Sequence, residues 1–417
     1  MKNKLFPAPL LLMAGLGGYL FLLLLTVYHQ QAPLFDEPLF IPNVYLFEKY
    51  GLSREFLVNI DNQAPGPLYQ FVHIIFKPLT HMQTPGIRLV NVALLGLTIL
   101  VLAAAIMRMQ AKDFRTALLP ALNIMAIPMI WQVSGMALTE IPPVFFAALS
   151  VLLIYIALQR SVITGSLLAL LGGLCLGLSI LGRSPFLVIV PASAVLLLYH
   201  FQDRRRWLLL FLYNAVALAM CVPVFLIWQG LMPPRQAITG AGGIDIWHGI
   251  LAFAYGALLV IIIAPSWFIF NRKTGWYLLI TYFILLAANV TLLHYSYSPL
   301  SEALDKILPA KAMQLYPFII SPLLATVAIY FIVCSLLRAW QRREDVFFLF
   351  ILFSGMLLLA SSFKVTHLFS SRYVAQAAPF IVLALAPYDK ITYGKVLRFG
   401  MGMVIGLLSL ETYFHFR

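Results

Sequence analysis

Charged residues are scarce in this sequence. Of its 417 residues, 10% are Asp, Glu, Lys or Arg and 62% are hydrophobic, whereas soluble domains carry about 25% charged residues. So little charge cannot cover the two or three cores that a water-soluble chain of this length would bury. The shortage excludes a soluble protein and predicts that the apolar residues face lipid and neighbouring helices.

The signatures of several catalytic classes are also missing. Three cysteines occur, Cys175, Cys221 and Cys334, each inside an apolar run, and none has the spacing of a zinc site or a CxxC motif. No HExxH, no Walker-type glycine loop and no GxSxG is present. Chemistry that uses zinc, ATP or a serine nucleophile is therefore disfavoured, and no cofactor is predicted.

Apolar runs of the length that spans a bilayer, about 17 to 25 residues, recur along the whole chain and predict about thirteen transmembrane helices. They lie near 8–28, 87–107, 116–133, 141–159, 165–181, 185–200, 207–229, 249–270, 275–294, 315–337, 346–362, 373–387 and 396–412. The predicted fold class is an all-α polytopic membrane protein. Residues 1–417 form a single integral membrane domain, without a separate soluble domain.

The net charge of +13 comes in short clusters between the apolar runs rather than along one face, so nucleic acid is not predicted as a partner. Because Lys and Arg near span ends stay in the cytoplasm, the clusters set the orientation. They alternate consistently at Lys2, Lys4, Arg108, Lys112, Arg115, Arg160, Arg204, Arg205, Arg206, Arg272, Lys273, Arg338, Arg342, Arg343, Lys390, Lys395 and Arg398. We expect a multi-pass protein of the inner or plasma membrane with its N-terminus in the cytoplasm and its C-terminus outside.

Most acidic residues fall on the opposite, outer side, among them Asp36, Glu37, Asp61, Glu140, Asp245, Glu302 and Asp305. The longest outer segment is 29–86, between the first two spans. Within it, Leu39 to Tyr50 and Leu68 to Pro78 carry apolar residues at three- and four-residue spacing. This pattern predicts short amphipathic helices lying in the membrane interface.

Asp36 and Glu37 follow closely on the first predicted span. A carboxylate at the outer membrane surface, beside apolar residues, can act as a general base toward a hydroxyl. The alternative is that the pair caps the next helix, since Asp before Pro is a common helix start.

The surrounding order of motifs resembles the GT-C superfamily of polyprenyl-phosphate-sugar-dependent glycosyltransferases. The sequence reads FDEPLFIPNVYLFEKYGL, then NIDNQAPGPLYQFVHIIF, then PGIRLVN at the next span. It is similar to members of glycosyltransferase families 39 and 83 and to the eukaryotic dolichyl-phosphate-glucose transferase. The resemblance covers the first 190 or so residues best, and it implies that Asp36 is the catalytic acid of the family's motif, with Glu37 as its neighbour.

The resemblance extends to a second outer loop, SGMALTEIPP. It implies that Glu140 binds the acceptor or supports the first-loop acid, and Asp61 is assigned to the same group. The alternative for Glu140 is a carboxylate favoured by the dipole at a helix N-terminus. In LSILGRSPF, Arg183 either pairs with Glu140 or Asp36 or contacts the donor phosphate.

A late segment, FKVTHLFSSRY, resembles the family's loop that ends in Arg-Tyr. Cations there would stabilise a lipid-phosphate leaving group. We rank Arg372 first and Lys364 second, and add Arg183 and Tyr69 to the predicted donor-phosphate site. The alternative for these cations is snorkelling at the interface. His367 is a weaker candidate for a base or a ligand.

The resemblance implies an inverting transfer of a sugar from a polyprenyl-phosphate donor to a glycan, lipid or protein acceptor. No metal is predicted, although some GT-C enzymes use a divalent cation, which keeps that cofactor open. The alternative function is a multi-pass transporter or lipid flippase, which usually buries ionisable residues at mid-membrane. A ligase or polymerase of the O-antigen type would need a long, Arg-rich late outer loop, and the late loops here are short.

The orientation is testable with reporter fusions at Arg205 and Arg342. Both positions belong to basic clusters, so both fusions should report the cytoplasm. A periplasmic or lumenal signal from either fusion would contradict the alternation of the charge clusters.

Overall fold

The computed structural model of the protein describes residues 7–61, 65–235, 243–295, 297, 309–366 and 369–415. Throughout these ranges the regular secondary structure is helical. Glu302, Asp305 and His367, all considered above, lie outside the described residues.

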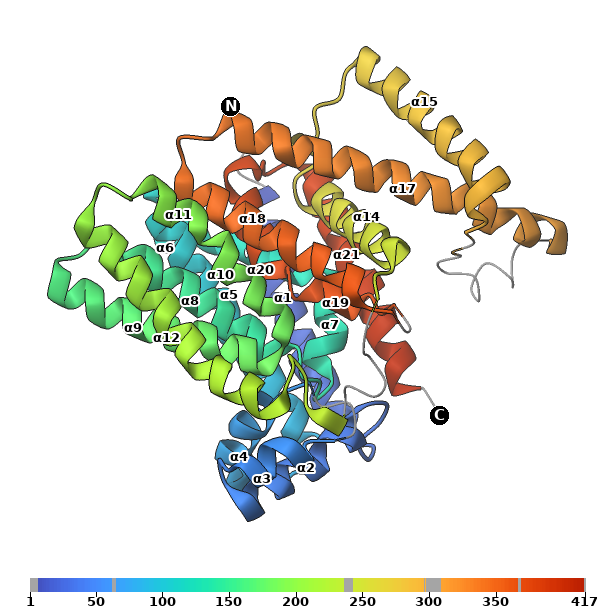
Figure 1. The fold of residues 1–417 in the computed structure, drawn as a ribbon. Coiled ribbons are helices and arrows are strands. Elements are labelled where there is room, and N and C mark those ends of the chain that lie inside the picture. The colour runs from blue at the N-terminus through green and yellow to red at the C-terminus, as the bar shows by residue number, and fades with distance from the viewer. Residues whose placement is uncertain are drawn as a thin grey trace.

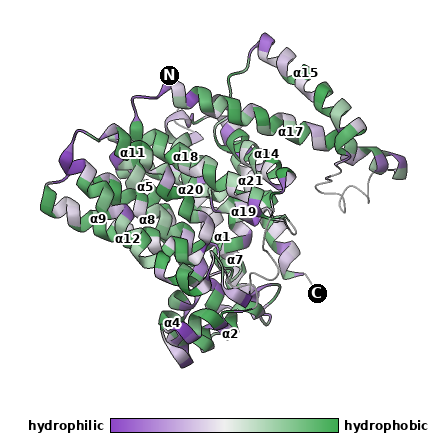
Figure 2. Ribbon diagram, viewed as in Figure 1, coloured by the Kyte–Doolittle hydropathy of each residue, from purple (hydrophilic) through white to green (hydrophobic). Residues whose placement is uncertain are grey.

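Nine helices of the described chain are long and apolar enough to cross a membrane. They are α1 (Pro7–Tyr28), α5 (Gly86–Gln110), α9 (Val162–Gly182), α12 (Arg204–Trp228), α14 (Ile246–Ile263), α15 (Arg272–Ala288) with the π-helical turn η5 (Asn289–Leu293), α17 (Ala310–Gln341), α18 (Val346–Ala360) with η6 (Ser361–Lys364), and α21 (Tyr393–Phe414). The chain is therefore an integral, multi-pass membrane protein. Figure 2 shows apolar colours along the long helices, with polar colours gathered at helix ends and in the first loop.

The predicted count of about thirteen spans is not confirmed, because the remaining predicted runs are short or bent. The run at 116–133 is α6 (Phe114–Ala121), η2 (Leu122–Ala126) and α7 (Pro128–Gly135), bent by 81° at the break. Three other runs form apolar helical segments of only 10–17 residues, shorter than the roughly 20 residues that cross a hydrocarbon core. Length and composition alone thus support nine spans, or ten with the bent pair counted as one.

The three shorter segments still belong to the bundle. They are α8 (Ile141–Ala157), then η3 (Ser184–Val188) with α10 (Ile189–Ala192) and α11 (Ala194–Tyr199), then α20 (Ala378–Leu385) with η7 (Ala386–Tyr388). Every residue of α20 is buried, so this helix lies inside the protein rather than against lipid. Two further short pieces are η4 (Pro265–Trp267) and α19 (Arg372–Ala375).

The first loop, between α1 and α5, folds into three helices below the bundle in Figure 1: α2 (Glu37–Tyr50), α3 (Arg54–Asn59) and α4 (Leu68–Thr80). The two helices predicted in this loop are confirmed as α2 and α4, whereas α3 was not predicted. The indole Nε1 of Trp228 in α12 donates to the carbonyl of Leu57 at 2.9 Å. The loop is therefore fixed to the bundle.

The Pro-Gly-Pro segment before α4 makes a second fixed contact. A Cβ atom at Gly66 would overlap the carbonyl oxygen of Leu181, and one at Gly182 would meet Leu68 and Pro143. These close approaches exclude a side chain at either glycine. They bring the start of α4 against the end of α9, directly before Arg183.

The two ends of the bundle are distinct. At one end, the ring of His29, just after α1, stacks on Phe414 at the end of α21 with centroids 4.0 Å apart, so the first loop and the end of α21 share a face. Two other contacts involve the basic loops. Nη2 of Arg205 donates to the carbonyl of Leu158 at 3.1 Å, and the hydroxyl of Tyr155 donates to the carbonyl of Arg108 at 3.2 Å. This segregation is consistent with the predicted topology, although the cytoplasmic side itself stays a prediction.

Candidate active site

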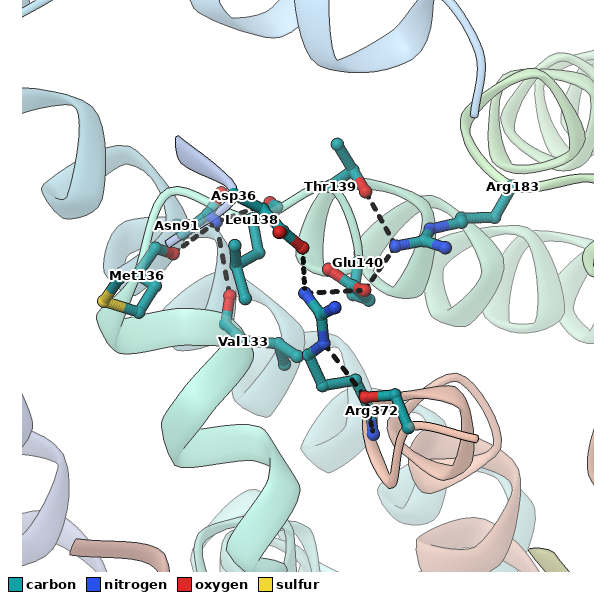
Figure 3. Close-up of polar contacts among 10 residues, drawn as sticks. Asp36, Asn91, Val133, Met136, Leu138, Thr139, Glu140, Arg183 and Arg372 are labelled. Carbon is teal, nitrogen blue, oxygen red and sulfur yellow. Dashed lines mark hydrogen bonds and ion pairs between the residues drawn. The ribbon is translucent and has the colours of Figure 1, made fainter. Parts of the chain in front are cut away.

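Four charged side chains from distant parts of the chain converge at the end of the bundle that carries the first loop (Figure 3). Asp36 precedes α2, Glu140 precedes α8, Arg183 follows α9 and Arg372 begins α19. All four were predicted from the sequence as site residues. They form a cluster that is partly open, since the side chains of Asp36, Arg372 and Arg183 keep 17%, 13% and 15% exposure while Glu140 keeps 1%.

Asp36 occupies the N-cap position of α2, but its side chain makes no capping hydrogen bond. Instead, its Oδ2 accepts from Nη1 of Arg372 at 2.9 Å. Its other oxygen, Oδ1, accepts no hydrogen bond from the described residues. The carboxylate of Asp36 therefore does not cap α2. Asp36 presents one oxygen fixed by a cation and one oxygen available to a ligand.

The backbone before Asp36 is strained. Phe35 has a φ of 56°, the left-handed region that bulky residues rarely adopt. In this conformation the guanidinium carbon of Arg372 lies 4.9 Å from the centre of the Phe35 ring. The Phe35 ring also contacts Tyr413 in an edge-to-face arrangement, with centroids 4.7 Å apart. The turn thus places Asp36 in the cluster and brings Phe35 into a cation–π contact with Arg372.

Glu140 is fully buried, and its carboxylate lies close to two arginines. Its Oε1 pairs with Nη2 of Arg183 and lies 4.0 Å from Nη1 of Arg372. The same nitrogen of Arg183 donates to Oγ1 of Thr139 at 2.8 Å. Arg183 therefore pairs with Glu140, the first of the two alternatives given for it above, and its contact with a donor phosphate stays a prediction. The other oxygen of Glu140, Oε2, is buried without a hydrogen-bond partner among the described residues, which marks a place for a substrate hydroxyl or a water.

Glu37, predicted as a catalytic neighbour of Asp36, lies beneath the cluster in a network of its own. Nε of Arg88 donates to Oε1 of Glu37 at 2.8 Å, and Nη2 of Arg88 donates to Oε2 at 2.6 Å. The backbone amides of Leu34 and Ala137 donate to the same carboxylate, each at 2.8 Å. Both side chains are fully buried. With all these donors engaged, Glu37 positions its neighbours rather than facing a substrate.

Asn91, one turn after Arg88, holds the loop that carries Glu140. Its Nδ2 donates to the carbonyls of Met136 at 2.9 Å and Leu138 at 2.8 Å, with a longer contact to Val133 (Figure 3). Together with the Glu37 bond to Ala137, this amide fixes the path of the chain before Glu140. The sequence analysis quoted both residues within PGIRLVN but gave neither a role.

Tyr373 is a further member of the cluster that the sequence analysis did not assign. The pKa of its phenol is raised, chiefly because the group is buried. The positive charges of Arg183 and Arg372 lower this pKa, and the negative charges of Glu140 and Asp36 raise it. The hydroxyl therefore stays protonated near neutral pH. For Arg372, burial lowers the pKa, but Glu140 and Asp36 outweigh burial and raise it. Arg372 is thus a permanent cation at this site.

The remaining predicted site residues lie outside this cluster of contacts. Asp61 is half exposed and accepts from Nη1 of Arg235 at 3.2 Å. Lys364, at the end of η6, is exposed. Tyr69 is buried within the first loop, its ring 4.0 Å from that of His73, and its hydroxyl has no hydrogen-bond partner among the described residues. These three stay predictions, and Arg372 is the cation that the structure brings to Asp36.

The donor set of the cluster bears on a metal. In the described ranges, no group of three His, Cys, Asp or Glu side chains is arranged to hold a metal ion. The two carboxylates of the cluster, Asp36 and Glu140, each face a guanidinium instead. The guanidiniums neutralise these carboxylates and repel a divalent cation.

Comparison with known proteins finds only solved structures of low similarity. No family model and no curated protein matches the chain. Similar solved structures include two crystal structures of ArnT from Cupriavidus metallidurans. The first, bound to undecaprenyl phosphate, is 14% identical with a TM-score of 0.47 and covers 96% of this chain and 77% of ArnT. The second, in the apo state, is 14% identical with a TM-score of 0.46 and covers 95% and 76%. At this level of similarity, we infer function from the chain's own side chains.

The buried Glu37–Arg88 pair predicts a large stability effect. Glu37→Gln leaves the charge of Arg88 buried and unpaired, which costs about 3–5 kcal/mol in folded proteins. We expect a marked fall in the thermal unfolding midpoint of the detergent-purified protein.

The matched control is Glu48→Gln, which removes the exposed partner of Lys77. An exposed pair contributes about 0–1 kcal/mol, so this variant should unfold close to the wild type. Equal midpoints for the two variants would show that the buried pair does not hold the site together.

Proposed function

We propose that the chain is a membrane glycosyltransferase that moves a sugar from a polyprenyl-phosphate donor to an acceptor hydroxyl, with inversion, on the outer face of the membrane. The hypothesis rests on the arrangement of the Asp36 carboxylate and the Arg372 guanidinium at the end of the bundle that carries the first loop. The sugar is a hexose or a pentose, and the acceptor is a hydroxyl on a glycan, a lipid or a protein.

The proposed base is Asp36. Its Oδ1 makes no hydrogen bond to the described residues, whereas Oδ2 is held by Arg372, so the carboxylate is oriented and still able to receive a proton. Oδ1 takes the proton of the acceptor hydroxyl while the acceptor oxygen forms a bond to the anomeric carbon. Attack from the face opposite the phosphate inverts that carbon.

The proposed leaving-group site is Arg372. The bond between the anomeric carbon and the phosphate oxygen breaks, and its electron pair departs with the lipid phosphate. Among the described residues, Nη2 of Arg372 makes no hydrogen bond, while Nη1 contacts Asp36 and Nε contacts Ser370 at 3.1 Å. A guanidinium can therefore donate to the phosphate through Nη2 without releasing the base. Tyr373 and the exposed Lys364 are proposed as further donors to the same anion.

The observation that carries the proposal is that a single guanidinium contacts the candidate base and keeps a free donor for an anion. A sugar placed between Oδ1 of Asp36 and Nη2 of Arg372 would meet base and leaving-group donor at once, as proximity catalysis requires. Glu140 supports the arrangement in two ways. Its Oε1 lies near Arg372, and its unpartnered Oε2 is suited to accept a hydroxyl of the sugar or the acceptor.

The test is sugar transfer in proteoliposomes with a panel of polyprenyl-phosphate sugars. Asp36→Asn keeps the shape of the side chain but cannot accept the proton, so we expect turnover to fall about 10²–10⁴-fold, the typical contribution of a general base. Donor binding, measured separately, should fall much less.

The matched control is Asp113→Asn, which changes another N-cap aspartate, at the start of α6, where Asn caps equally well. Its turnover should equal that of the wild type. Equal turnover in wild type and Asp36→Asn would remove the proposed base. Movement of the intact lipid across the bilayer without sugar transfer would favour a flippase instead.

A further inference from the structure

A row of aromatic rings leads from the candidate active site into the space between α14 and α17. We define the aromatic row as Phe369, Tyr255, Tyr297, Tyr295 and Trp247. It begins at Tyr373, whose ring lies edge-on to Phe369 with centroids 6.3 Å apart. Phe369 then stacks on Tyr255 of α14 at 6.0 Å. The row is therefore continuous with the cluster that contains Arg372.

The outer part of the aromatic row is a set of nearly parallel rings. The hydroxyls of Tyr255 and Tyr297 form a hydrogen bond at 3.1 Å. The rings of Tyr297 and Tyr295 lie 6.5 Å apart with an 8° angle between their planes, and those of Tyr295 and Trp247 lie 3.9 Å apart with a 2° angle. All five side chains are half-buried, so the row keeps surface that a ligand can reach.

Hydrogen bonds hold these rings in place. The backbone of Tyr295 exchanges two hydrogen bonds with the side-chain amide of Asn289, each at 2.9 Å. The amide of Tyr297 donates to Oγ of Ser321 in α17 at 2.9 Å, and the same hydroxyl donates back to the carbonyl of Tyr297. Such a fixed arrangement lowers the entropy that a ligand loses on binding.

A general aromatic belt at the membrane interface does not account for this arrangement. Belt residues face lipid and water individually, as do Trp276 and Tyr277 on α15, which are 58% and 66% exposed. The rings of the aromatic row face one another and hydrogen-bond to the protein. The row is therefore organised around its own stacked faces rather than around the lipid.

The chemistry of the aromatic row suits a carbohydrate better than an isoprenoid tail. An aromatic face accepts the C–H face of a sugar ring, and phenol hydroxyls beside it exchange hydrogen bonds with sugar hydroxyls. Burial, Tyr297 and Asp245 raise the pKa of Tyr295, which keeps its hydroxyl a neutral donor. The hydroxyls of Tyr255 and Tyr297 bond to each other, but the hydroxyl of Tyr295 makes no hydrogen bond to the described residues. An isoprenoid chain would leave this hydroxyl without a partner, at a cost in free energy.

We propose that the aromatic row binds saccharide units of the acceptor. This inference rests on the proposed function, in which the donor contributes one sugar held between Asp36 and Arg372. Because the row starts beyond Tyr373 and extends over several rings, its occupant is longer than that single sugar. The acceptor is then a glycan whose non-reacting units stack along the row while its reactive hydroxyl reaches Asp36.

The test uses the full chain in nanodiscs, probed with an array of fluorescent soluble oligosaccharides of one to six units. We expect the wild type to bind at least one class of oligosaccharide, and Trp247→Leu to bind it at least tenfold more weakly. Tyr297→Phe, which removes one hydroxyl and keeps the ring, should weaken binding by a smaller factor. This conservative variant keeps the test valid if the leucine variant unfolds.

The matched control is Trp276→Leu, the same substitution outside the aromatic row, which should bind like the wild type. Asp36→Asn should also retain saccharide binding while losing transfer, so the base and the row have separate readouts. Three results would overturn the proposal: no oligosaccharide binds the wild type, Trp247→Leu and Trp276→Leu bind equally, or polyprenyl phosphate alone displaces the bound saccharide.

Discussion

The ion pair between Glu37 and Arg88 is the contact on which the geometry of the candidate site depends. It is fully buried, and its carboxylate also accepts the backbone amides of Leu34 and Ala137. One group thus ties the turn before Asp36, the start of α5 and the loop that leads to Glu140. Because buried ions are costly unless they are fully paired, any shift of these three segments would leave charge unsatisfied. The pair therefore fixes the two carboxylates of the cluster relative to each other.

The cluster beside this pair contains equal numbers of negative and positive side chains. Two carboxylates, Asp36 and Glu140, face two guanidiniums, Arg183 and Arg372, and Arg372 lies between the carboxylates. The charges balance, so the cluster is tolerable at the membrane surface before any substrate arrives. Among the described residues, Oδ1 of Asp36, Oε2 of Glu140 and Nη2 of Arg372 nevertheless make no hydrogen bond. Under the proposed function, a sugar phosphate and a hydroxyl would supply partners for these atoms.

The sequence predicted which residues form this site better than it predicted their roles. Asp36, Glu140, Arg183 and Arg372 were selected because the segments that carry them resemble motifs of the GT-C superfamily, and all four converge. Glu37 was placed with Asp36 because the two are adjacent, but Glu37 pairs with Arg88 whereas Asp36 pairs with Arg372. The roles of Arg88 and Asn91 could not be predicted, since their partners lie more than 40 residues away. The predicted number of spans is not confirmed for a related reason: apolar runs such as α20 are buried in protein, and hydropathy does not distinguish burial in protein from burial in lipid. The membrane class, and the helices α2 and α4 of the first loop, followed from composition and periodicity alone.

The central claim is that Arg372 holds the candidate base and the donor phosphate together. A structure of the full chain with a bound polyprenyl phosphate tests it most directly. We expect a phosphate oxygen at about 2.7–2.9 Å from Nη2 of Arg372, the length of a charge-assisted hydrogen bond. Asp36 should stay within reach of the same guanidinium, and the Glu37–Arg88 pair should be unchanged. A phosphate bound among other cations, with Arg372 contacting only protein, would contradict the account.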